Sequence, residues 1–386
     1  MNRLEYWFAA AILGVLGWMF SLLPLRRRRV VLATARTSKL DGNLLFVHRA
    51  MRAARPDLEY VLHLEPYGYD RRRKLAYLGR LVRGMYHLQT SRLVVVDNAY
   101  LPVHVRGHRR ETTVVQVWHA AGALKRFGAD TTRPLREPER TFLHRNYDYV
   151  ITSGEAAREP YAAALRTPVQ RVLALGSPRT DFFFDEAAVA EARARVLAAF
   201  PVLAGRRVVI HAPTFRGRGA HKLAAESLDA ERLRRLLPPE YALIAKTHPN
   251  LPVSRPDVGV PGFDVVIGSE FDINELFTVS EILITDYSSC IFDFALLRKP
   301  IVLLVGDLEA YEADPGLYLD YRTEMIGTQV ASTDETAEVI VGGRFDLSGY
   351  DAFVERHLGA ARGDASARFV GRFLGKGVAD PVLRSP

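Results

Sequence analysis

Short runs of apolar, often β-branched residues recur along most of the sequence, and they constrain its fold more than any other feature. Most of these runs are continuously apolar rather than alternating, as in strands of a sheet that helices cover on both faces. The spacings between most pairs leave room for a helix, which predicts right-handed βαβ units and doubly wound parallel sheets. The predicted strands are 30–33, 59–64, 93–97, 113–118, 149–152, 171–175, 207–211, 242–246, 264–267, 281–285 and 301–305.

The length and one long helical segment predict two domains. The chain has 386 residues, which exceeds one ordinary hydrophobic core. An Ala-rich, charged segment at 186–200 predicts a helix that ends at Pro201, where a second series of strands begins. We therefore expect Rossmann-like domains over 30–190 and 191–349, with a helix of the tail 350–386 returning to pack on the first. Two such domains facing each other across a cleft, closed by a C-terminal crossover helix, form the GT-B fold, an α/β architecture.

The first 29 residues combine an uncharged run at 6–25 with four consecutive arginines at 26–29. Twenty residues of helix extend about 30 Å, which is the thickness of the hydrocarbon core of a bilayer. Arginines that follow such a run hold the next part of the chain on the cytoplasmic side. We expect a membrane-associated hydrophobic helix that either spans the membrane or lies in its interface. A helix docked on the first domain is the main alternative, and a cleaved signal peptide fits less well because its positive charge would precede the run.

The basic balance of the chain, a formal net charge of +8, indicates an anionic partner. A phosphorylated substrate, an anionic membrane and nucleic acid all satisfy that requirement. Aromatic residues are not interleaved with a basic patch, so we expect no nucleic acid. The sequence contains no Walker-type or dinucleotide-binding glycine loop, and no histidine spacing supports a metal site.

Polar residues able to carry chemistry end or follow four of the predicted strands. In a doubly wound sheet, ligands bind beyond the carboxyl ends of the strands, so these residues are the candidate site. They are His119, Thr214, Arg216, Lys246, His248, Asp286, Ser288 and Ser289.

Two of these residues are predicted to be catalytic. A neutral imidazole at His119 is able to take a proton near pH 7, whereas a histidine that caps the following helix is the alternative. His248 is able to donate to a diphosphate and to stabilise charge on a leaving phosphate, although a structural histidine is also common at a strand end.

The other six are predicted to bind an anionic donor. Arg216 is suited to bidentate phosphate binding, and Lys246 adds positive charge beside it. Thr214 lies in the same strand-end segment as Arg216. Ser288 and Ser289, with Asp286 just before them, begin a predicted helix at 290–299. Serine hydroxyls at such a start are able to bind phosphate or simply to cap the helix.

Five ordered blocks of sequence resemble the CDP-glycerol glycerophosphotransferases of teichoic-acid synthesis. This GT-B family also includes ribitol-phosphate transferases and capsule enzymes. One departure is Ala120, where the family has a glycine. The blocks are Q-V-W-H at 116–119, G-S-P-R-T-D at 176–181, A-P-T-F-R at 212–216, K-T-H-P at 246–249 and I-T-D-Y-S-S at 284–289.

The resemblance implies a transferase that moves glycerol phosphate, or a related polyol phosphate, from a CDP-activated donor and releases CMP. The implied acceptor is a hydroxyl of a lipid-linked saccharide or cell-wall polymer at the cytoplasmic face of the cell membrane. His119 would be the base, and Asp286 would position the loop whose serines bind the CDP-glycerol diphosphate with Arg216 and His248. No tightly bound cofactor is expected; the polyol, the number of transfers and any divalent metal stay open. A GT-B transferase of nucleotide-activated sugars and a non-catalytic anion-binding protein are the alternatives.

Overall fold

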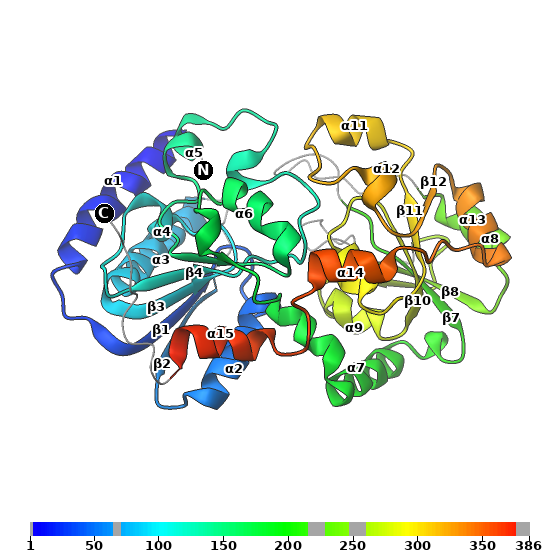
Figure 1. Ribbon diagram of the computed structural model, residues 1–386, viewed down its shortest axis with the longest axis horizontal. Coiled ribbons are helices and arrows are strands. Elements are labelled where there is room, and N and C mark those ends of the chain that lie inside the picture. Colours follow the sequence, from blue (N-terminus) through cyan, green and yellow to red (C-terminus); the bar gives the residue numbers. More distant parts are fainter. Residues whose placement is uncertain (1–2, 65–70, 215–227, 247–259, 376–386) are drawn as a thin grey trace. The chain divides into compact units, whose positions relative to one another are not determined.

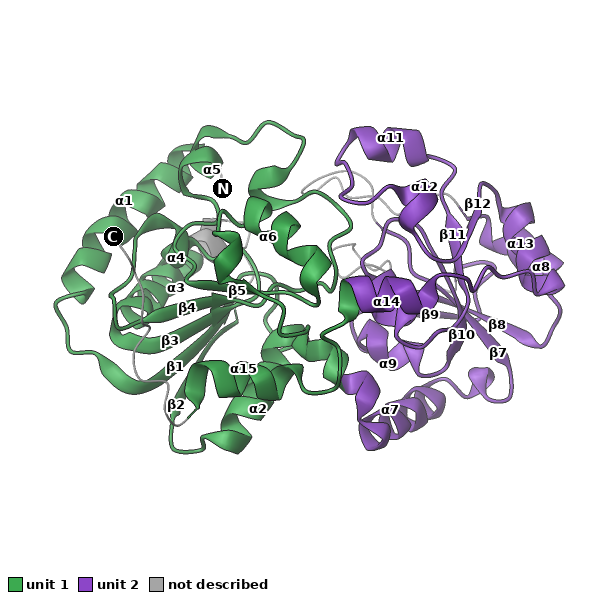
Figure 2. Cartoon of the chain, in the orientation of Figure 1, with its two compact units in different colours: residues 1–181, 357–386 green, residues 182–356 purple. Residues whose placement is uncertain are grey.

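A computed structural model describes residues 3–64, 71–214, 228–246 and 260–375 (Figure 1). Within them the chain forms two six-stranded sheets in which neighbouring strands run parallel. The chain divides into two compact units, one of residues 1–181 and 357–386 and the other of residues 182–356 (Figure 2). The expectation of an α/β fold with parallel sheets is therefore confirmed.

Unit 1 contains a sheet with strand order β2-β1-β3-β4-β5-β6. The order reverses between β1 and β3, and such a reversal is where ligands bind beyond the carboxyl ends of the strands. The strands are β1 (Arg26–Thr34), β2 (Glu59–Leu64), β3 (Ser91–Val96), β4 (Thr113–Gln116), β5 (Tyr149–Ile151) and β6 (Val172–Leu173).

Helices cover both faces of this sheet. On one face α2 (Gly42–Ala54) packs against α15 (Ala365–Leu374), and Phe369 of α15 joins the core formed by the strands. On the other, α3 (Arg71–Thr90) contacts β1 and β3 and is itself packed by α1 (Arg3–Phe20) and α4 (Leu101–Val105) (Figure 1). The remaining helices of the unit are α5 (Glu137–Phe142) and α6 (Arg158–Ala164).

Unit 2 contains a sheet with strand order β12-β11-β10-β7-β8-β9. In this dinucleotide-fold order the reversal lies between β10 and β7. The strands are β7 (Arg207–His211), β8 (Tyr241–Lys246), β9 (Val265–Ile267), β10 (Ser280–Thr285), β11 (Ile301–Leu304) and β12 (Thr328–Val330).

The helices of unit 2 include α8 (Ala230–Leu236) and α13 (Thr333–Gly342), which pack together over one face of the sheet. Leu233 and Ile340 from these helices meet Val209 and Ile284 of the strands in one buried core. The others are α7 (Glu186–Ala199), α9 (Ile273–Phe277), α10 (Cys290–Ala295), α11 (Leu308–Ala313), α12 (Tyr321–Glu324) and α14 (Tyr350–Leu358), in which the chain returns to unit 1.

The N-terminal segment differs from its prediction. The helix ends at Phe20, and the arginines 26–29 form the first part of β1 rather than a flank outside the fold. Arg29 is buried, and its Nε lies 3.1 Å from Oε1 of Glu59 on the neighbouring strand. Pairing with β2 and β3 extends the strand through these arginines, which the apolar pattern alone did not indicate.

The membrane-spanning interpretation of this segment is not supported. Among the described residues, no helix combines the length and apolar character needed to cross a bilayer. Helix α1 packs on unit 1 through Ala9, Leu13 and Gly17. A methyl group at Gly17 would lie 2.6 Å from Cδ of Arg106 and 2.8 Å from Sδ of Met85 on α3, so a larger residue there would require these two side chains to shift.

Candidate functional site

His119 follows β4 at the carboxyl edge of the unit 1 sheet. Its Nδ1 lies 3.2 Å from the backbone carbonyl oxygen of Asp97, which follows the adjacent strand β3. A carbonyl oxygen only accepts hydrogen bonds, so Nδ1 carries the proton in the neutral ring. Nε2 is then the nitrogen that is able to accept a proton. The residues after His119 form bends rather than a helix, so the helix-capping alternative does not apply.

Aromatic rings pack around this histidine. The ring of Trp118 lies 4.4 Å from that of His119 and 4.6 Å from that of Phe127, measured between centroids. The ring of His144 meets the Trp118 ring nearly edge-on at 5.8 Å. Trp118 has φ of 48°, a left-handed value that residues with a Cβ seldom adopt. The indole of Trp118 thus packs against the imidazole of His119.

The turn after His119 is held by buried side chains of the same unit. Gly122, with φ of 64°, donates its N–H to Oγ of Ser153 at 2.9 Å. The hydroxyl of Tyr161 donates to the carbonyl oxygens of Ala120 and Gly122, both at 3.0 Å. Ala120 lies outside the left-handed region, so an alanine at this position costs no backbone strain.

Asp97 brings a buried carboxylate close to this edge. Burial raises the pKa of Asp97 to about 6, although Nη2 of Arg36 lies 3.6 Å from its Oδ2. Arg36 in turn binds Asp41, just before α2. Arg36 and Asp97 come just after β1 and β3, where the strand order of unit 1 reverses. They precede the recognised sequence blocks, so no motif marked them.

In unit 2, the carboxyl ends of β7 and β10 are joined by Thr214 and Asp286. The Thr214 backbone N–H donates to Oδ1 of Asp286, and its hydroxyl donates to Oδ2, both at 2.8 Å. The hydroxyl of Tyr321 donates to the Asp286 carbonyl oxygen at 2.5 Å. The structure therefore brings these two predicted residues together at the point where the strand order of this sheet reverses.

Ser288 and Ser289 follow directly and lead into α10. Helix α10 ends at Ala295, earlier than the predicted 290–299. The Ser288 Oγ accepts a long hydrogen bond, 3.4 Å, from the backbone N–H of Cys290. Ser289 is the N-cap residue, yet its side chain makes no capping hydrogen bond. Both serines are half-buried. The Ser288 hydroxyl thus makes one weak bond at the start of the helix, whereas the Ser289 hydroxyl has no capping role.

Lys246 ends β8, but its amine points to backbone groups. Its Nζ donates to the carbonyl oxygens of Gly268 and Phe271, the latter at 2.8 Å, and burial lowers its pKa. The side chain thus ties β8 to the segment after β9. Arg216 and His248, two further predicted site residues, lie outside the described residues. Within the described ranges, no group of three or more His, Cys, Asp or Glu side chains is arranged to hold a metal ion.

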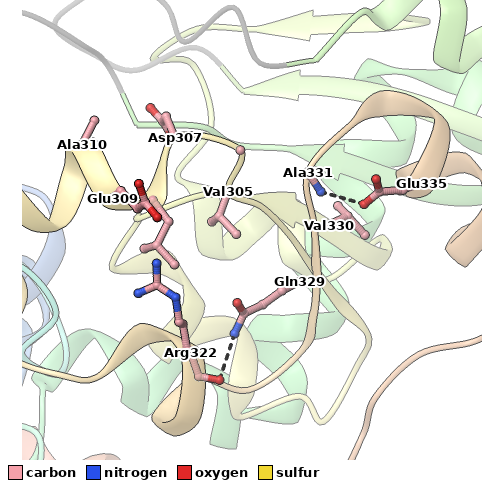
Figure 3. A pocket seen from close by; sticks show the side chains of 11 residues that line it. Val305, Asp307, Glu309, Ala310, Arg322, Gln329, Val330, Ala331 and Glu335 are labelled. Atoms are coloured by element: carbon pink, nitrogen blue, oxygen red, sulfur yellow. Dashed lines mark hydrogen bonds between the residues drawn. The ribbon is translucent and has the colours of Figure 1, made fainter.

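An open pocket of about 680 Å³ lies at the carboxyl ends of β11 and β12 in unit 2. Figure 3 shows Glu309 and Arg322 on one side of it and Ala331 and Glu335 on the other. Asp307 at its rim accepts a hydrogen bond from Tyr287 at 2.8 Å, which links the pocket to the T-D-Y-S-S segment. None of the predicted site residues that the structure describes lines it. Its lining is Val305, Gly306, Asp307, Leu308, Glu309, Ala310, Arg322, Gln329, Val330, Ala331 and Glu335.

Comparison with known proteins identifies relatives of the whole fold. A sequence model of the family described as CDP-glycerol:poly(glycerophosphate) glycerophosphotransferase matches residues 16–375. The chain is 33% identical to the teichoic acid poly(ribitol-phosphate) polymerase of Bacillus spizizenii, over 94% of this chain but 59% of that protein. It is 30% identical to the teichoic acid ribitol-phosphate primase of the same organism, over 94% of this chain and 97% of that protein. A solved structure of the wall teichoic acid polymerase TagF matches with a TM-score of 0.72 and 20% identity, over 96% of this chain and 97% of that chain, and it shares the fold.

Proposed function

Since this chain belongs to the CDP-glycerol:poly(glycerophosphate) glycerophosphotransferase family, we propose that it transfers a polyol phosphate from a CDP-activated donor. The acceptor is a hydroxyl of a lipid-linked saccharide or a cell-wall polymer, and the second product is CMP. Glycerol phosphate and ribitol phosphate are both candidates for the transferred group, because two relatives bear the names of ribitol-phosphate enzymes.

The observation that carries this proposal is the hydrogen bond between Nδ1 of His119 and the Asp97 carbonyl oxygen. It assigns the proton of the neutral ring to Nδ1 and makes Nε2 the basic nitrogen. A base is needed because the acceptor hydroxyl must lose its proton as it attacks phosphorus. The motif that contains His119 also lies at the carboxyl edge of its sheet, where ligands of such folds bind.

The donor half of the proposal rests on unit 2. Asp286 is 1% exposed, and both of its carboxylate oxygens bind Thr214, so it acts on the protein rather than on the donor. The half-buried hydroxyls of Ser288 and Ser289 are the proposed diphosphate donors. Arg216 and His248 join them in the proposal on the strength of their sequence blocks. Lys246 contributes positive charge at the end of β8, while its amine stays hydrogen-bonded to the two backbone carbonyls.

The reaction then proceeds by in-line displacement. The acceptor oxygen forms a bond to the phosphorus that carries the polyol, and the bond from this phosphorus to the bridging oxygen of CDP breaks. His119 takes the hydroxyl proton, and CMP leaves with the bridging oxygen. Hydrogen bonds and positive charge around the phosphate oxygens stabilise the transition state, as in other transfers that depend on positioning and electrostatics.

A donor panel tests this function on the full chain. Nucleotide release is measured with each donor and a lipid-linked saccharide acceptor, with or without Mg²⁺. The product is CMP from CDP-glycerol, CDP-ribitol and CMP-activated sugars, and UDP from UDP-activated sugars. We expect turnover with a CDP-polyol and none with the sugars.

The variant His119→Ala should lose about 100-fold or more in kcat while it still binds CDP. His48→Ala on α2 is the matched control, and full activity in the His119 variant would refute the base assignment.

We further propose that α1 attaches the enzyme to the cytoplasmic face of an anionic membrane. The helix is apolar on two sides: Ala9, Ala10 and Leu13 face unit 1, whereas a second row is exposed. A helix that is apolar all round is buried in protein or lipid. The exposed row recurs at helical spacing and consists of Leu4, Trp7, Phe8, Val15, Trp18 and Met19, and Leu22 in the turn after the helix is also exposed.

Arginines near the end of α1 fit the same partner. Arg26, Arg27 and Arg28 are exposed at the start of β1. Arg109 donates to the carbonyl oxygen of Leu23 at 2.5 Å, which places a fourth arginine beside them. An apolar helix face with adjacent arginines matches the headgroup region of a bilayer that contains anionic lipid. Such a surface would also carry a lipid-linked acceptor.

A further inference from the structure

We propose that Asn43 is a positioning residue for His119, an inference that rests on the proposed function of that histidine. Asn43 lies in the first turn of α2, which is distant in sequence from every recognised motif. It acts on the loop of residues 117–122, here called the His119 loop. The role assigned to it is to hold this loop in the conformation that general-base catalysis requires.

The side-chain amide of Asn43 is buried and fully used. Its Nδ2 donates to the carbonyl oxygens of Val117 and Trp118, both at 2.9 Å. Its Oδ1 accepts from the Ser177 hydroxyl and from the Arg179 backbone N–H, both at 3.0 Å. A primary amide has two hydrogens to donate and an oxygen that accepts twice, so these four bonds saturate it and fix its orientation. Asn43 therefore joins the loop after β4 to the segment after β6.

Two further side chains make hydrogen bonds to the backbone of the His119 loop. Nη1 of Arg179 donates to the His119 carbonyl oxygen at 3.2 Å. Oε1 of Gln116 accepts from the Trp118 backbone N–H at 2.9 Å. The carbonyls of residues 117, 118 and 119 and the amide of residue 118 thus each have a side-chain partner. These bonds hold Trp118 in its left-handed conformation, which would otherwise relax.

This arrangement connects Asn43 to the geometry of the imidazole. The ring of His119 is set by its own backbone and by the carbonyl oxygen of Asp97 at Nδ1. Without Asn43, two carbonyls of the loop lose their buried donor, and the loop is free to move away from β3. A displacement of about 1 Å in a catalytic group is enough to lower the rate about 100-fold.

The test compares Asn43→Ala with the unmodified full chain, with CDP-glycerol and CDP-ribitol as donors. We expect kcat to fall about 100-fold. The KM for the donor and the affinity for CDP should stay unchanged, because the proposed donor-binding residues belong to unit 2. The acid limb of the kcat pH profile should also move, since the hydrogen bond at Nδ1 is no longer fixed.

Gln89→Ala is the matched control for lost stability. Gln89 is a buried amide of unit 1 that donates to the Gly107 carbonyl oxygen at 3.1 Å. It ends α3 just before β3, so it lies at the amino edge of the sheet, away from His119. Its variant should lose thermal stability and keep kcat. Equal losses of kcat in both variants, or an unchanged kcat in Asn43→Ala, would overturn the proposal.

Arg179→Met is a second variant that tests the same positioning role if Asn43→Ala does not fold. It removes the contact with the His119 carbonyl from a half-buried side chain, and we expect a lower kcat with unchanged CDP affinity. An unchanged kcat in this variant counts against the positioning role. His119→Ala distinguishes failure of the base assignment from failure of this inference. If this variant keeps kcat, the assignment of His119 as the base fails. If it loses kcat and the Asn43 and Arg179 variants do not, only this inference fails.

Discussion

Asp286 binds Thr214 with both oxygens of its carboxylate, at 2.8 Å from the backbone nitrogen and 2.8 Å from the hydroxyl. The pair crosses from β10 to β7, where the strand order of the unit 2 sheet reverses. Since Asp286 is 1% exposed, these hydrogen bonds satisfy a buried carboxylate inside the protein. This is the arrangement expected of a residue that shapes the T-D-Y-S-S loop and leaves the following serines to bind the donor.

Replacement of Thr214 by valine should weaken this connection. The variant keeps the backbone hydrogen bond but leaves Oδ2 of a buried carboxylate without the hydroxyl. Hydrogen bonds to charged groups contribute about 1.5–3 kcal/mol, so the free energy of unfolding should fall by about that amount. The KM for the CDP-polyol should rise, because the loop that carries Ser288 is less well fixed. Urea unfolding and donor titration measure the two effects.

Thr336→Val is the control for that substitution. Thr336 is a buried threonine of α13 whose hydroxyl donates to the Ser332 carbonyl oxygen at 2.8 Å. Its variant should lose stability and keep the KM of the unmodified protein. If the Thr214 variant also keeps that KM, the loop does not depend on Asp286 for its shape.

Ser289→Ala should separate donor binding from stability. The hydroxyl makes no capping hydrogen bond, so the free energy of unfolding should change by less than about 0.5 kcal/mol. A lost hydrogen bond to a charged phosphate should weaken CDP binding about tenfold or more. Calorimetric titration with CDP measures the affinity.

Ser332→Ala is the control for Ser289→Ala, and it should lower stability without weakening CDP binding. The Oγ of Ser332 accepts from the Glu335 backbone N–H at 3.2 Å and caps α13. Loss of that cap should cost about 1 kcal/mol of stability without any change in CDP affinity. Equal CDP affinities in the Ser289 variant and the unmodified protein would remove Ser289 from the donor site.

The strands were predictable because a parallel sheet is buried on both faces. Each of the eleven predicted runs overlaps a strand of the structure, and continuous apolar runs such as 301–305 mark them clearly. The twelfth strand, β12, has the sequence T-Q-V and a single buried apolar side chain, so it gave no such signal. The arginines at 26–29 were misplaced for the same reason, because their strand pairing depends on β2 and β3 rather than on apolar side chains.

The positions of the candidate site residues were predictable only where a residue lies close to the end of a strand, and their roles stay predictions. Asp286 directly follows β10 and His119 comes shortly after β4, so both lie at the carboxyl edges of their sheets. Asn43 was missed because its partners Val117 and Trp118 are brought to it by the sheet and not by local sequence. Lys246 satisfied the same rule as His119, yet the loop after β9 supplies carbonyls that bind its amine.

Asp97 should make the stability of the protein depend on pH. Burial raises its pKa from 3.8 to about 6, so the folded protein binds this proton more tightly than the unfolded chain does. Ionisation therefore costs stability as the pH rises from about 4 to about 6, and two pKa units correspond to about 3 kcal/mol. Asp97→Asn has no such ionisation. The difference in free energy of unfolding, variant minus unmodified protein, should rise by about 2.4 kcal/mol between pH 4 and pH 7.

Activity gives an independent check on the same variant. His119 contacts the backbone carbonyl of Asp97 rather than its carboxylate, so Asp97→Asn should retain kcat. Urea unfolding at several pH values and CMP release at pH 7 are the measurements. A stability difference that does not change with pH would show that the carboxyl is ionised normally in the folded protein.

The exposed row of α1 should bind lipid vesicles. Sedimentation with vesicles of phosphatidylcholine, alone or mixed with phosphatidylglycerol, should show binding that requires the anionic lipid and weakens with salt. The double variant Phe8→Glu with Trp18→Glu places two charges on the exposed row and should abolish binding with little change in stability. Val341→Glu with Leu347→Glu adds the same charges at exposed apolar positions of unit 2 and should leave binding intact.

The arginines beside α1 should account for the preference for anionic lipid. Arg26, Arg27 and Arg28 are exposed, and each arginine near an anionic surface contributes about 1 kcal/mol. Their joint replacement by glutamine should therefore reduce binding to the mixed vesicles toward the level seen with phosphatidylcholine alone. The apolar row and Arg109 remain in that variant, so the residual binding should depend on salt less steeply than that of the unmodified protein. If the unmodified protein ignores phosphatidylglycerol, or if both double variants lose binding equally, α1 is a docking helix of unit 1 and its outer face has another role.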